Sequence, residues 1–427
     1  MITSIGTHPV CSEQCSEHRQ PICETNMYDD DDDEYFDLFE DRQSDLPFWM
    51  NHWNHELPFG LAMLELLEKV IWLPNSEKQL PLIAAYICCN SRAAKNSGYL
   101  FHYGRSESGK SQVIKLVSGI FQIQPLLANS TGVACRNHLQ ALRYYLDSIG
   151  NPILSSKGIP RERDHCFLLI DNISEGNLEP SGYLYQILLG GYDRSTSQIS
   201  IGGKNGKNIE FNSFGFKILS SIEAIHLAHN LTEIHGRLLP IFHEKPPENW
   251  KQEISPDDIN WAGLDKLYLS LWGRENSKKY RPIIKDLQSC KNDWIEEGLS
   301  PRKWQISLEI MGSGILSGIW KSSEEAISFF RDYFGLLQEK QENSDSSFSL
   351  LLQQIIDEVA GFKIDAYLSQ GRNEEAKKVR IPAKQLRETI NLAQSNGELD
   401  ITPTNERIAS AMFRLGWKLT PDGWIQI

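Results

Sequence analysis

The sequence predicts an α/β protein with a parallel sheet, a helical cap before it, a helical region after it and a small helix-and-strand module at the C-terminal end. Two short apolar runs, 98–103 and 166–171, have the pattern of buried strands. The stretch 112–121 between them has the apolar spacing of a helix. Strand, helix and strand in this order are typical of parallel strands joined by crossovers.

The segments 57–74 and 79–89 have the spacing of amphipathic or buried helices, and they form the predicted cap. Neither is long enough to span a membrane, and no signal peptide precedes them. We therefore expect a cytoplasmic protein without membrane contact. With 427 residues, of which 40% are hydrophobic, the chain should bury a large core and divide into two or three domains.

The loop after the first strand fits the phosphate-binding pattern G-x-x-x-x-G-K-[ST]. Its eight residues are Gly104, Arg105, Ser106, Glu107, Ser108, Gly109, Lys110 and Ser111. In such a P-loop the glycines bring backbone N–H groups around a phosphate, Lys110 neutralises the β and γ oxygens, and the Ser111 hydroxyl ligates Mg²⁺. The strand before the loop and the helix after it match the context that this pattern requires. The sequence thus predicts a P-loop nucleotide-binding core with ATP and Mg²⁺ as cofactors; the alternative is a surface turn rich in Gly and Ser.

A carboxylate ends the second apolar strand. Asp171 would lie at the carboxyl end of a central parallel strand, where it can hold the water shell of the Mg²⁺. The next residue is Asn172, whereas most nucleotide hydrolases of this type have a second acid there. Three alternatives follow: Asn172 orients the attacking water by hydrogen bonding, Glu175 supplies the carboxylate, or hydrolysis is slow.

Two short alternating segments, 196–201 and 208–211, flank a turn rich in Gly and Asn and predict a β-hairpin. Lys204 and Lys207 lie at its tip. The alternative is an ordinary surface turn with solvated lysines. The run 214–223 predicts a further core strand that ends in polar residues, and Arg237 stands just before another apolar run.

The order of P-loop, acidic strand end, lysine-tipped hairpin, polar-ended strand and arginine resembles superfamily 3 and AAA+-like helicase-type ATPases of phages, plasmids and viral primase-helicases. The resemblance covers about residues 60–245. It implies a hexameric ring with single-stranded DNA in a central pore, where Lys204 and Lys207 grip the backbone. It also implies that Ser221 senses the γ-phosphate and that Arg237 reaches the nucleotide of the neighbouring subunit; the alternative for Arg237 is a solvated turn arginine.

The acidity of the chain is concentrated at its N-terminal end. Residues 1–56 contain fourteen acidic and two basic residues, a net charge of −12, while the remainder has 42 acidic and 41 basic residues, a net charge of −1. Such a block self-repels, so a solvated arm is the default expectation. The alternative is that its aromatic residues, interleaved with acids at 35–40, dock on a basic protein partner or compete with DNA.

Eight cysteines in a long chain without a secretory signal do not indicate a disulfide framework. Five of them lie in or beside apolar segments and are expected to act as small buried hydrophobes: Cys88, Cys89, Cys135, Cys166 and Cys290. The arm holds Cys11, Cys15, His18 and Cys23, which could supply four zinc ligands. Because their spacing is not that of a paired knuckle, free thiols are the expected state.

The C-terminal part predicts helices at 264–272, 283–295 and 324–340, then a polar linker at 341–347. After it come a helix at 348–360, a strand at 379–381, helices at 383–394 and 405–415, and two strands around Pro421-Asp-Gly423. This order resembles a winged helix. Arg407 and Arg414 would be exposed on its recognition helix, to contact DNA or a protein partner.

The sequence therefore predicts an acidic arm at 1–56, a P-loop ATPase domain with a helical cap at 57–245, a helical lid or connecting region at 246–345 and a winged-helix-like domain at 346–427. Two functions follow from it. The first is an ATP-driven DNA helicase or translocase in replication of a mobile element. The second is a nucleotide-switched assembly or regulatory ATPase, in defence or transposition, that binds a partner without unwinding DNA.

Overall fold

The computed structural model describes residues 57–127, 130, 132–147, 149, 151–178, 182–202, 208–227, 231–258, 264–376, 378–395, 403 and 405–426. The acidic arm with its Cys11, Cys15, His18 and Cys23 lies outside these residues, as do Lys204 and Lys207. In the described part, no helix combines the length and the apolar character that a membrane span needs.

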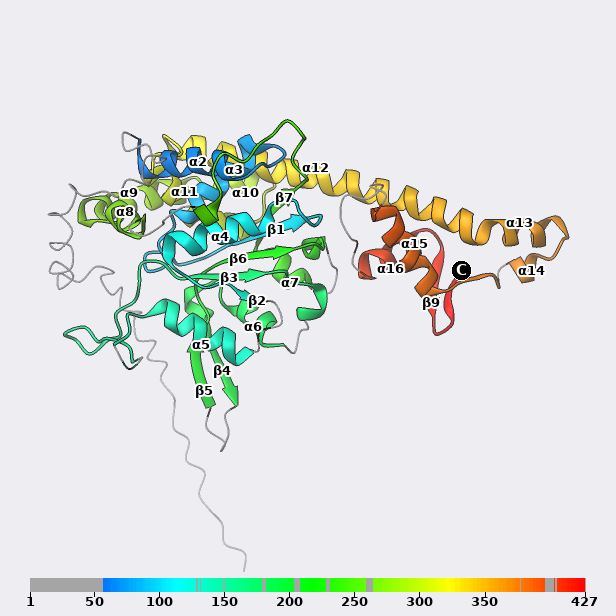
Figure 1. Ribbon diagram of the computed structural model, residues 1–427, viewed down its shortest axis with the longest axis horizontal. Helices are drawn as coiled ribbons and strands as arrows, with labels where there is room; N and C mark the ends of the chain where they lie inside the picture. Colours follow the sequence, from blue (N-terminus) through cyan, green and yellow to red (C-terminus); the bar gives the residue numbers. More distant parts are fainter. Residues whose placement is uncertain are drawn as a thin grey trace, which may run out of the picture.

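Five parallel strands form the central sheet in the order β2-β3-β6-β1-β7 (Figure 1). Their bounds are Leu126–Leu127 for β2, Phe167–Asp171 for β3, Phe216–Ser221 for β6, Tyr99–Gly104 for β1 and Leu238–His243 for β7. All residues of β1 and β6 are buried. Because the strands are parallel, the polar ends of β1, β3 and β6 meet at one edge, which confirms the predicted α/β class with a P-loop NTPase-like core.

Helices cover both faces of this sheet (Figure 1). On one side lie α2 (Phe59–Val70), α3 (Ser76–Ile87), α4 (Lys110–Phe121), α8 (Leu264–Leu271), α9 (Arg274–Ser289), α10 (Lys291–Glu296), α11 (Pro301–Leu316) and the first half of α12 (Ser323–Ile356). On the other lie α5 (Gly132–Arg143), α6 (Tyr183–Gly190), α7 (Thr232–His235) and the hairpin of β4 (Gln198–Gly202) and β5 (Asn208–Asn212). One hydrophobic core runs from Ala62 to Phe334, so the sheet and the helical region after it are packed together.

A buried tyrosine fixes α3 to the amino end of the sheet. The Tyr86 hydroxyl accepts a hydrogen bond from the Lys217 N–H and donates one to the Gly98 carbonyl, both at 2.8 Å. Its ring packs edge-to-face on Phe216, with the centroids 5.2 Å apart. Removing the hydroxyl would leave two buried backbone groups without this partner, so the helical cap and the sheet are joined as one rigid unit.

The helices differ from the prediction at α11 and at the predicted linker. The sequence pattern does not predict α11, which is buried on nearly all sides from Ile306 to Gly314 and so lacks a polar face. It also predicts a linker at 341–347, where α12 continues as helix over 34 residues, about 50 Å. The 341–347 segment contains neither Gly nor Pro, so nothing in it terminates a helix.

The C-terminal unit has a hydrophobic core of its own, built around Leu352, Ile381, Ile390, Met412 and Trp424. Its elements are the end of α12, a π-helical turn at Asp357–Gly361, α13 (Phe362–Ser369), α14 (Asn373–Ala376), β8 (Arg380–Ile381), α15 (Ala383–Ser395), α16 (Asn405–Arg414), β9 (Trp417–Thr420) and β10 (Gly423–Gln426). The three strands pair in the order β8-β10-β9. Helix, strand, two helices and a strand hairpin in this order are the arrangement that the sequence predicts.

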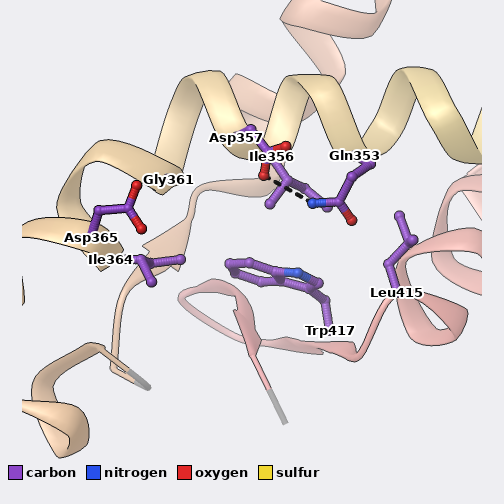
Figure 2. Close-up of a pocket in the computed structure, with 8 residues that line it drawn as sticks. All are labelled: Gln353, Ile356, Asp357, Gly361, Ile364, Asp365, Leu415 and Trp417. Carbon is purple, nitrogen blue, oxygen red and sulfur yellow. Dashed lines mark hydrogen bonds between the residues drawn. The ribbon is translucent and has the colours of Figure 1, made fainter. Parts of the chain in front are cut away.

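A pocket of about 280 Å³ opens between the π-helical turn and the start of β9. Figure 2 shows the Trp417 ring between Ile364 and Leu415, with the carboxylates of Asp357 and Asp365 nearby. The Gln353 amide donates to Asp357 at 2.9 Å (Figure 2). The charged residues that line the pocket are thus two carboxylates, which disfavours contact with DNA phosphates at this place.

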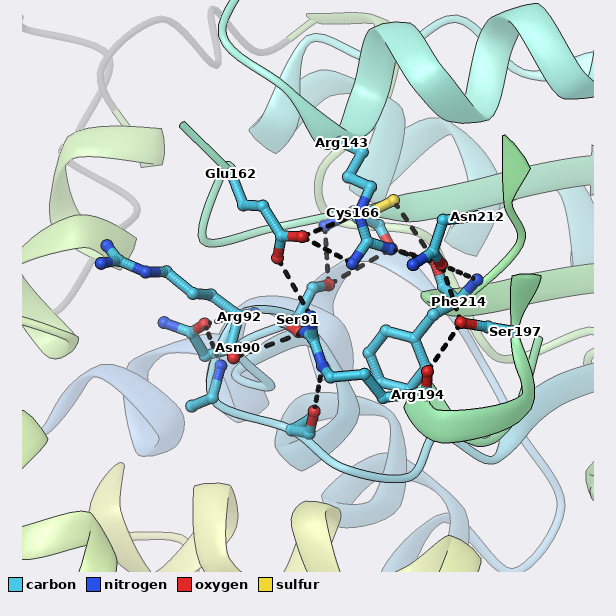
Figure 3. A network of polar contacts seen from close by, with 12 residues as sticks. Asn90, Ser91, Arg92, Arg143, Glu162, Cys166, Arg194, Ser197, Asn212 and Phe214 are labelled. Carbon is cyan, nitrogen blue, oxygen red and sulfur yellow. Dashed lines mark hydrogen bonds and ion pairs between the residues drawn. The ribbon is translucent and has the colours of Figure 1, made fainter. Parts of the chain in front are cut away.

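A network of ion pairs ties the base of the hairpin to α5 (Figure 3). Arg143, at the end of α5, donates to Glu162 at 2.7 and 3.0 Å and to the Asn212 side chain of β5 at 2.9 Å. Arg194, just before β4, donates to the second Glu162 oxygen at 3.1 Å. One carboxylate thus compensates two guanidinium groups and fixes both ends of the hairpin to the body.

Glu162→Gln should destabilise the fold, because it leaves the buried Arg143 cation, whose side chain is only 5% exposed, without a negative partner. We expect a loss of about 3 kcal/mol in the free energy of unfolding. Glu275→Gln is the matched control, since Glu275 pairs with Lys278 on the surface and should have no measurable effect. Urea unfolding of both variants measures the difference; equal stabilities would contradict the structural role of the network.

Candidate functional site

The P-loop leaves the sheet at the end of β1 and enters α4. Gly104 has φ +144° and Gly109 has φ +86°, both in the region that favours glycine. A Cβ on Gly104 would lie 2.0 Å from the His243 carbonyl oxygen, so a side chain has no room there. Both glycines of the motif are thus required by the backbone path, as the phosphate-binding pattern implies.

Lys110 begins α4, and its side chain folds back over the loop. Its ammonium group donates to the Gly104 carbonyl at 2.9 Å and to the Arg105 carbonyl. Burial lowers the pKa of Lys110 to about 8, although the nearby Asp171 carboxylate raises it in part. A phosphate bound in the loop would supply the negative charge that this buried ammonium lacks.

Asp171 lies between two serine hydroxyls at the carboxyl edge of the sheet. The Ser111 hydroxyl donates to it at 3.1 Å, and the Ser220 hydroxyl of β6 donates to it from the other side. Mg²⁺ binds oxygen at 2.0–2.1 Å, so neighbouring ligands of an octahedral ion lie about 2.9 Å apart. The Ser111 and Asp171 oxygens therefore fit an edge of a Mg²⁺ site.

In the described residues no group of three or more His, Cys, Asp or Glu side chains has the arrangement of an all-protein metal site.

The structure corrects the predicted γ-phosphate sensor. Ser221 is fully buried, donates to the Ile173 carbonyl at 2.6 Å and accepts from the Glu223 N–H at 2.9 Å. Ser220 faces Asp171 instead and accepts a hydrogen bond from the Asn172 N–H at 2.9 Å. Both serines are buried, and neighbouring side chains alternate between the faces of a strand, so a shift of one residue exchanges the serine that faces Asp171.

Asn172 lies exposed at the same edge, with φ +61°. Asparagine is one of the few residues other than glycine that adopt this left-handed conformation readily. The turn thus gives a conformational reason for an amide at this position. Glu175 begins a 3₁₀ turn at Glu175–Asn177, and its side chain lies outside the described residues.

Arg237 precedes β7, at the amino edge of the sheet. It is 8% exposed and lies 4.5 Å from the centre of the Tyr192 ring; Arg302 of α11 lies 4.3 Å from the same ring. Among the described residues, Nε and Nη1 of Arg237 have no hydrogen-bond partner. The alternative of a solvated turn arginine is therefore wrong.

The two arginines of α16, Arg407 and Arg414, differ from each other. Arg407 is 4% exposed and stacks 5.0 Å from the Phe348 ring of α12, so the prediction that it is exposed for DNA is wrong. The guanidinium instead joins α16 to α12. Arg414 is exposed at the end of α16, as predicted.

The predicted hairpin is confirmed by the antiparallel pairing of β4 and β5, from Gln198 with Asn212 to Gly202 with Asn208.

A pocket of about 340 Å³ adjoins the P-loop, a size in the range of small-molecule sites. One wall is the loop from Glu107 to Gln112. The opposite wall consists of Val70, Ile71, Trp72, Pro246, Trp250 and Gln252, from the end of α2 and the segment after β7. Two indole rings beside a phosphate cradle suit the base and ribose of a nucleotide.

The sequence does not predict these wall residues. Trp72 and Trp250 lie about 180 positions apart, and neither belongs to a motif. The only local signal is a tryptophan close to a proline at each position, Pro74 and Pro246–Pro247. Ser220 is missed as well, because Ser220 and Ser221 are equivalent in the sequence pattern.

No protein-family model and no curated protein matches this chain. Among solved structures, it has a likeness to "SCCmec type IV Cch - active helicase", with 15% identity and a TM-score of 0.38. The match covers 82% of this chain and 67% of that one. At this similarity the likeness supports no conclusion on activity.

The charge of Lys110 should make nucleotide affinity depend on pH. Because the pKa of Lys110 is lowered to about 8, its ammonium is charged at pH 7 and discharges as the pH rises through 8, whereas bound phosphates favour the charged form. The affinity for Mg–ATP should be level from about pH 6.5 to 7.5 and fall up to about tenfold per pH unit above 8. Calorimetric titration across this range tests it.

Lys110→Arg is the matched control, because a guanidinium stays charged throughout. Its affinity, even if reduced, should not fall above pH 8. An affinity of the unmodified protein that stays constant to about pH 9.5 would contradict the lowered pKa of Lys110.

Proposed function

We propose that this protein is an ATP-dependent DNA helicase- or translocase-like ATPase of the superfamily 3 or AAA+-like type. One observation carries the proposal: the P-loop with Lys110, the Ser111–Asp171 pair and the pocket with two tryptophans meet at one edge of a parallel sheet. Phosphate, metal and base can be bound there by neighbouring groups. The carboxyl edge of such sheets is where ligands of α/β proteins bind.

In this proposal the loop N–H groups and Lys110 bind the β- and γ-phosphates, and Trp72 and Trp250 enclose the base. Ser111 and Asp171 would hold Mg²⁺, which supplies positive charge against the phosphate oxygens. Ser220 holds the Asp171 carboxylate in place by its hydrogen bond. Asn172, exposed at this edge, would orient the attacking water through its amide.

A ring of subunits, hexameric in the proposal, would bring a second subunit to the amino edge of the sheet. Support comes from Arg237, whose Nε and Nη1 have no hydrogen-bond partner among the described residues. To stabilise the γ-phosphate of the neighbour's nucleotide, the Arg237 side chain, which is 8% exposed, would have to move away from the Tyr192 ring. Single-stranded DNA would pass through the pore along the hairpin. Strands β4 and β5 of this hairpin extend away from the central sheet beside α5 (Figure 1).

A second candidate is a nucleotide-switched assembly or regulatory ATPase that binds a protein partner without unwinding DNA. The observation in its favour is Asn172, which replaces the second acid beside Asp171 and would slow hydrolysis. The acidic arm and the acidic pocket by Trp417 also suit a basic protein partner better than DNA.

Strand displacement on a forked duplex separates the two candidates. We expect the full-length protein with Mg–ATP to release the displaced strand, and Lys110→Ala to lose both displacement and ATP turnover while its thermal unfolding stays unchanged. Turnover without displacement would favour the switch. Unchanged turnover in Lys110→Ala would rule out the P-loop as the active site.

Replacement of both Lys204 and Lys207 by alanine tests the proposed pore contact. Phosphate contacts release counterions without regard to base sequence, so single-stranded DNA binding should weaken equally for all sequences. The log–log slope of affinity against salt should become shallower by about 0.7 per lysine. Basal ATP hydrolysis should stay while its stimulation by DNA disappears. Unchanged affinity and salt slope would show that the hairpin does not contact DNA.

A further inference from the structure

Two histidines lie directly beneath the P-loop. His102 is on β1 and His243 is the last residue of β7; both are buried, with 0% and 1% of their surface exposed. Nδ1 of His102 lies 2.8 Å from Nε2 of His243, and Nδ1 of His243 lies 3.2 Å from the Ser108 carbonyl oxygen. The two rings therefore form a chain that ends on a backbone group of the loop.

The hydrogen-bond directions in this chain follow from its last acceptor. A carbonyl oxygen only accepts, so Nδ1 of His243 carries the proton and donates to Ser108. Nε2 of a neutral His243 is then an acceptor, and Nδ1 of His102 donates to it. Nε2 of His102 is left as a buried lone pair without a partner in the described residues. One tautomer of each ring satisfies these contacts.

This chain fixes the orientation of one peptide bond in the phosphate cradle. In a planar trans peptide the C=O and N–H groups point in opposite directions. The Ser108 carbonyl points inward to His243, so the Gly109 N–H points outward, to the side where the phosphate binds. If this peptide were flipped, its carbonyl oxygen would face the phosphate and repel it.

We propose that His243, oriented by His102, is a positioning residue for nucleotide binding, which holds the 108–109 peptide with its N–H directed at the phosphate. This role rests on the proposed nucleotide function of the P-loop. It differs from that of Lys110, since His243 acts through the loop backbone and does not touch the nucleotide.

The pKa values of both histidines are lowered, which agrees with two neutral rings that keep one tautomer each. Burial lowers the pKa of His243 to about 3, with Lys110 lowering it further, although the bond to Ser108 opposes this shift. Burial also lowers the pKa of His102, and His243 and Lys110 add to the effect. Both rings therefore stay neutral at physiological pH, and the histidine pair should add no pH dependence between about pH 5.5 and 8.

Calorimetric titration of the full-length protein with Mg–ADP tests the proposal without interference from hydrolysis. His243→Leu removes the donor and should weaken ADP binding about tenfold, the size expected when one hydrogen-bond donor is misdirected. His243→Asn offers an amide N–H near the position of Nδ1 and should bind within about threefold of the unmodified protein. ADP binding that His243→Asn retains and His243→Leu loses is the signature of a positioning role.

Tyr99→Phe is the matched control for a purely structural effect. Tyr99 is fully buried at the other end of β1, where its hydroxyl donates to the Leu188 carbonyl at 2.8 Å. Its loss should lower the unfolding temperature while the ADP affinity stays unchanged. If His243→Leu and Tyr99→Phe affect ADP binding equally, or if His243→Leu binds normally, the positioning role is wrong.

A second measurement is independent of whether the variants fold. In the unmodified protein labelled with ¹⁵N-histidine, NMR should show His243 protonated at Nδ1 and not at Nε2. The opposite tautomer would overturn the proposal. If the unmodified protein binds no nucleotide although the tautomer is as expected, the proposed function is wrong. The hydrogen bonds from His102 to His243 and from His243 to Ser108 are then still correct.

Discussion

The close approach of β1 and β7 at Gly104 is the constraint on which the site depends. The two strands run side by side to Gly104 and His243, and the chain has no room for a side chain at 104. The backbone leaves the sheet after Gly104 and forms the P-loop, whose Ser108 carbonyl oxygen lies 3.2 Å from Nδ1 of His243. The P-loop, the position of Lys110 and the orientation of the 108–109 peptide all follow from this close approach of β1 and β7.

The two edges of the sheet have different character. At the amino edge, Tyr86 links α3 to β6, and the buried Lys217 ammonium donates to three carbonyls, those of Gly191, Ser213 and Gly215. These contacts join the sheet and the helices rigidly. At the carboxyl edge, Ser111, Asp171 and Asn172 are accessible, and a pocket opens beside them. A stiff base with an open upper edge suits a site that must bind and release a charged ligand.

The sequence was sufficient for the parts of the fold that have strong local patterns. The P-loop, the strands on either side of it, the hairpin pairing and the order of elements in the C-terminal unit were all predictable from motif, periodicity and turn residues. α11 was not predictable, because a helix buried on all sides has no polar face to mark its period. α5 and α6 were also not predicted.

The site residues that the sequence missed or misplaced depend on tertiary packing. Which of Ser220 and Ser221 faces Asp171 is a matter of strand register, which no local pattern fixes here. Arg407 has the sequence context of an exposed helix face, yet it is buried against Phe348 of α12. Trp72 and Trp250 come together only because the end of α2 and the segment after β7 meet across the P-loop.

The central claim is that the P-loop and the tryptophan pocket together bind one nucleotide. Hydrogen–deuterium exchange of the full-length protein, with and without Mg–ATP, tests it most directly. Protection on adding Mg–ATP should appear in peptides that contain residues 104–112, 70–72 and 246–252, and should be absent in Lys110→Ala. Protection of the loop without the two tryptophan segments would contradict the assignment of the pocket to the base, and no protection in any of the three would contradict the claim itself.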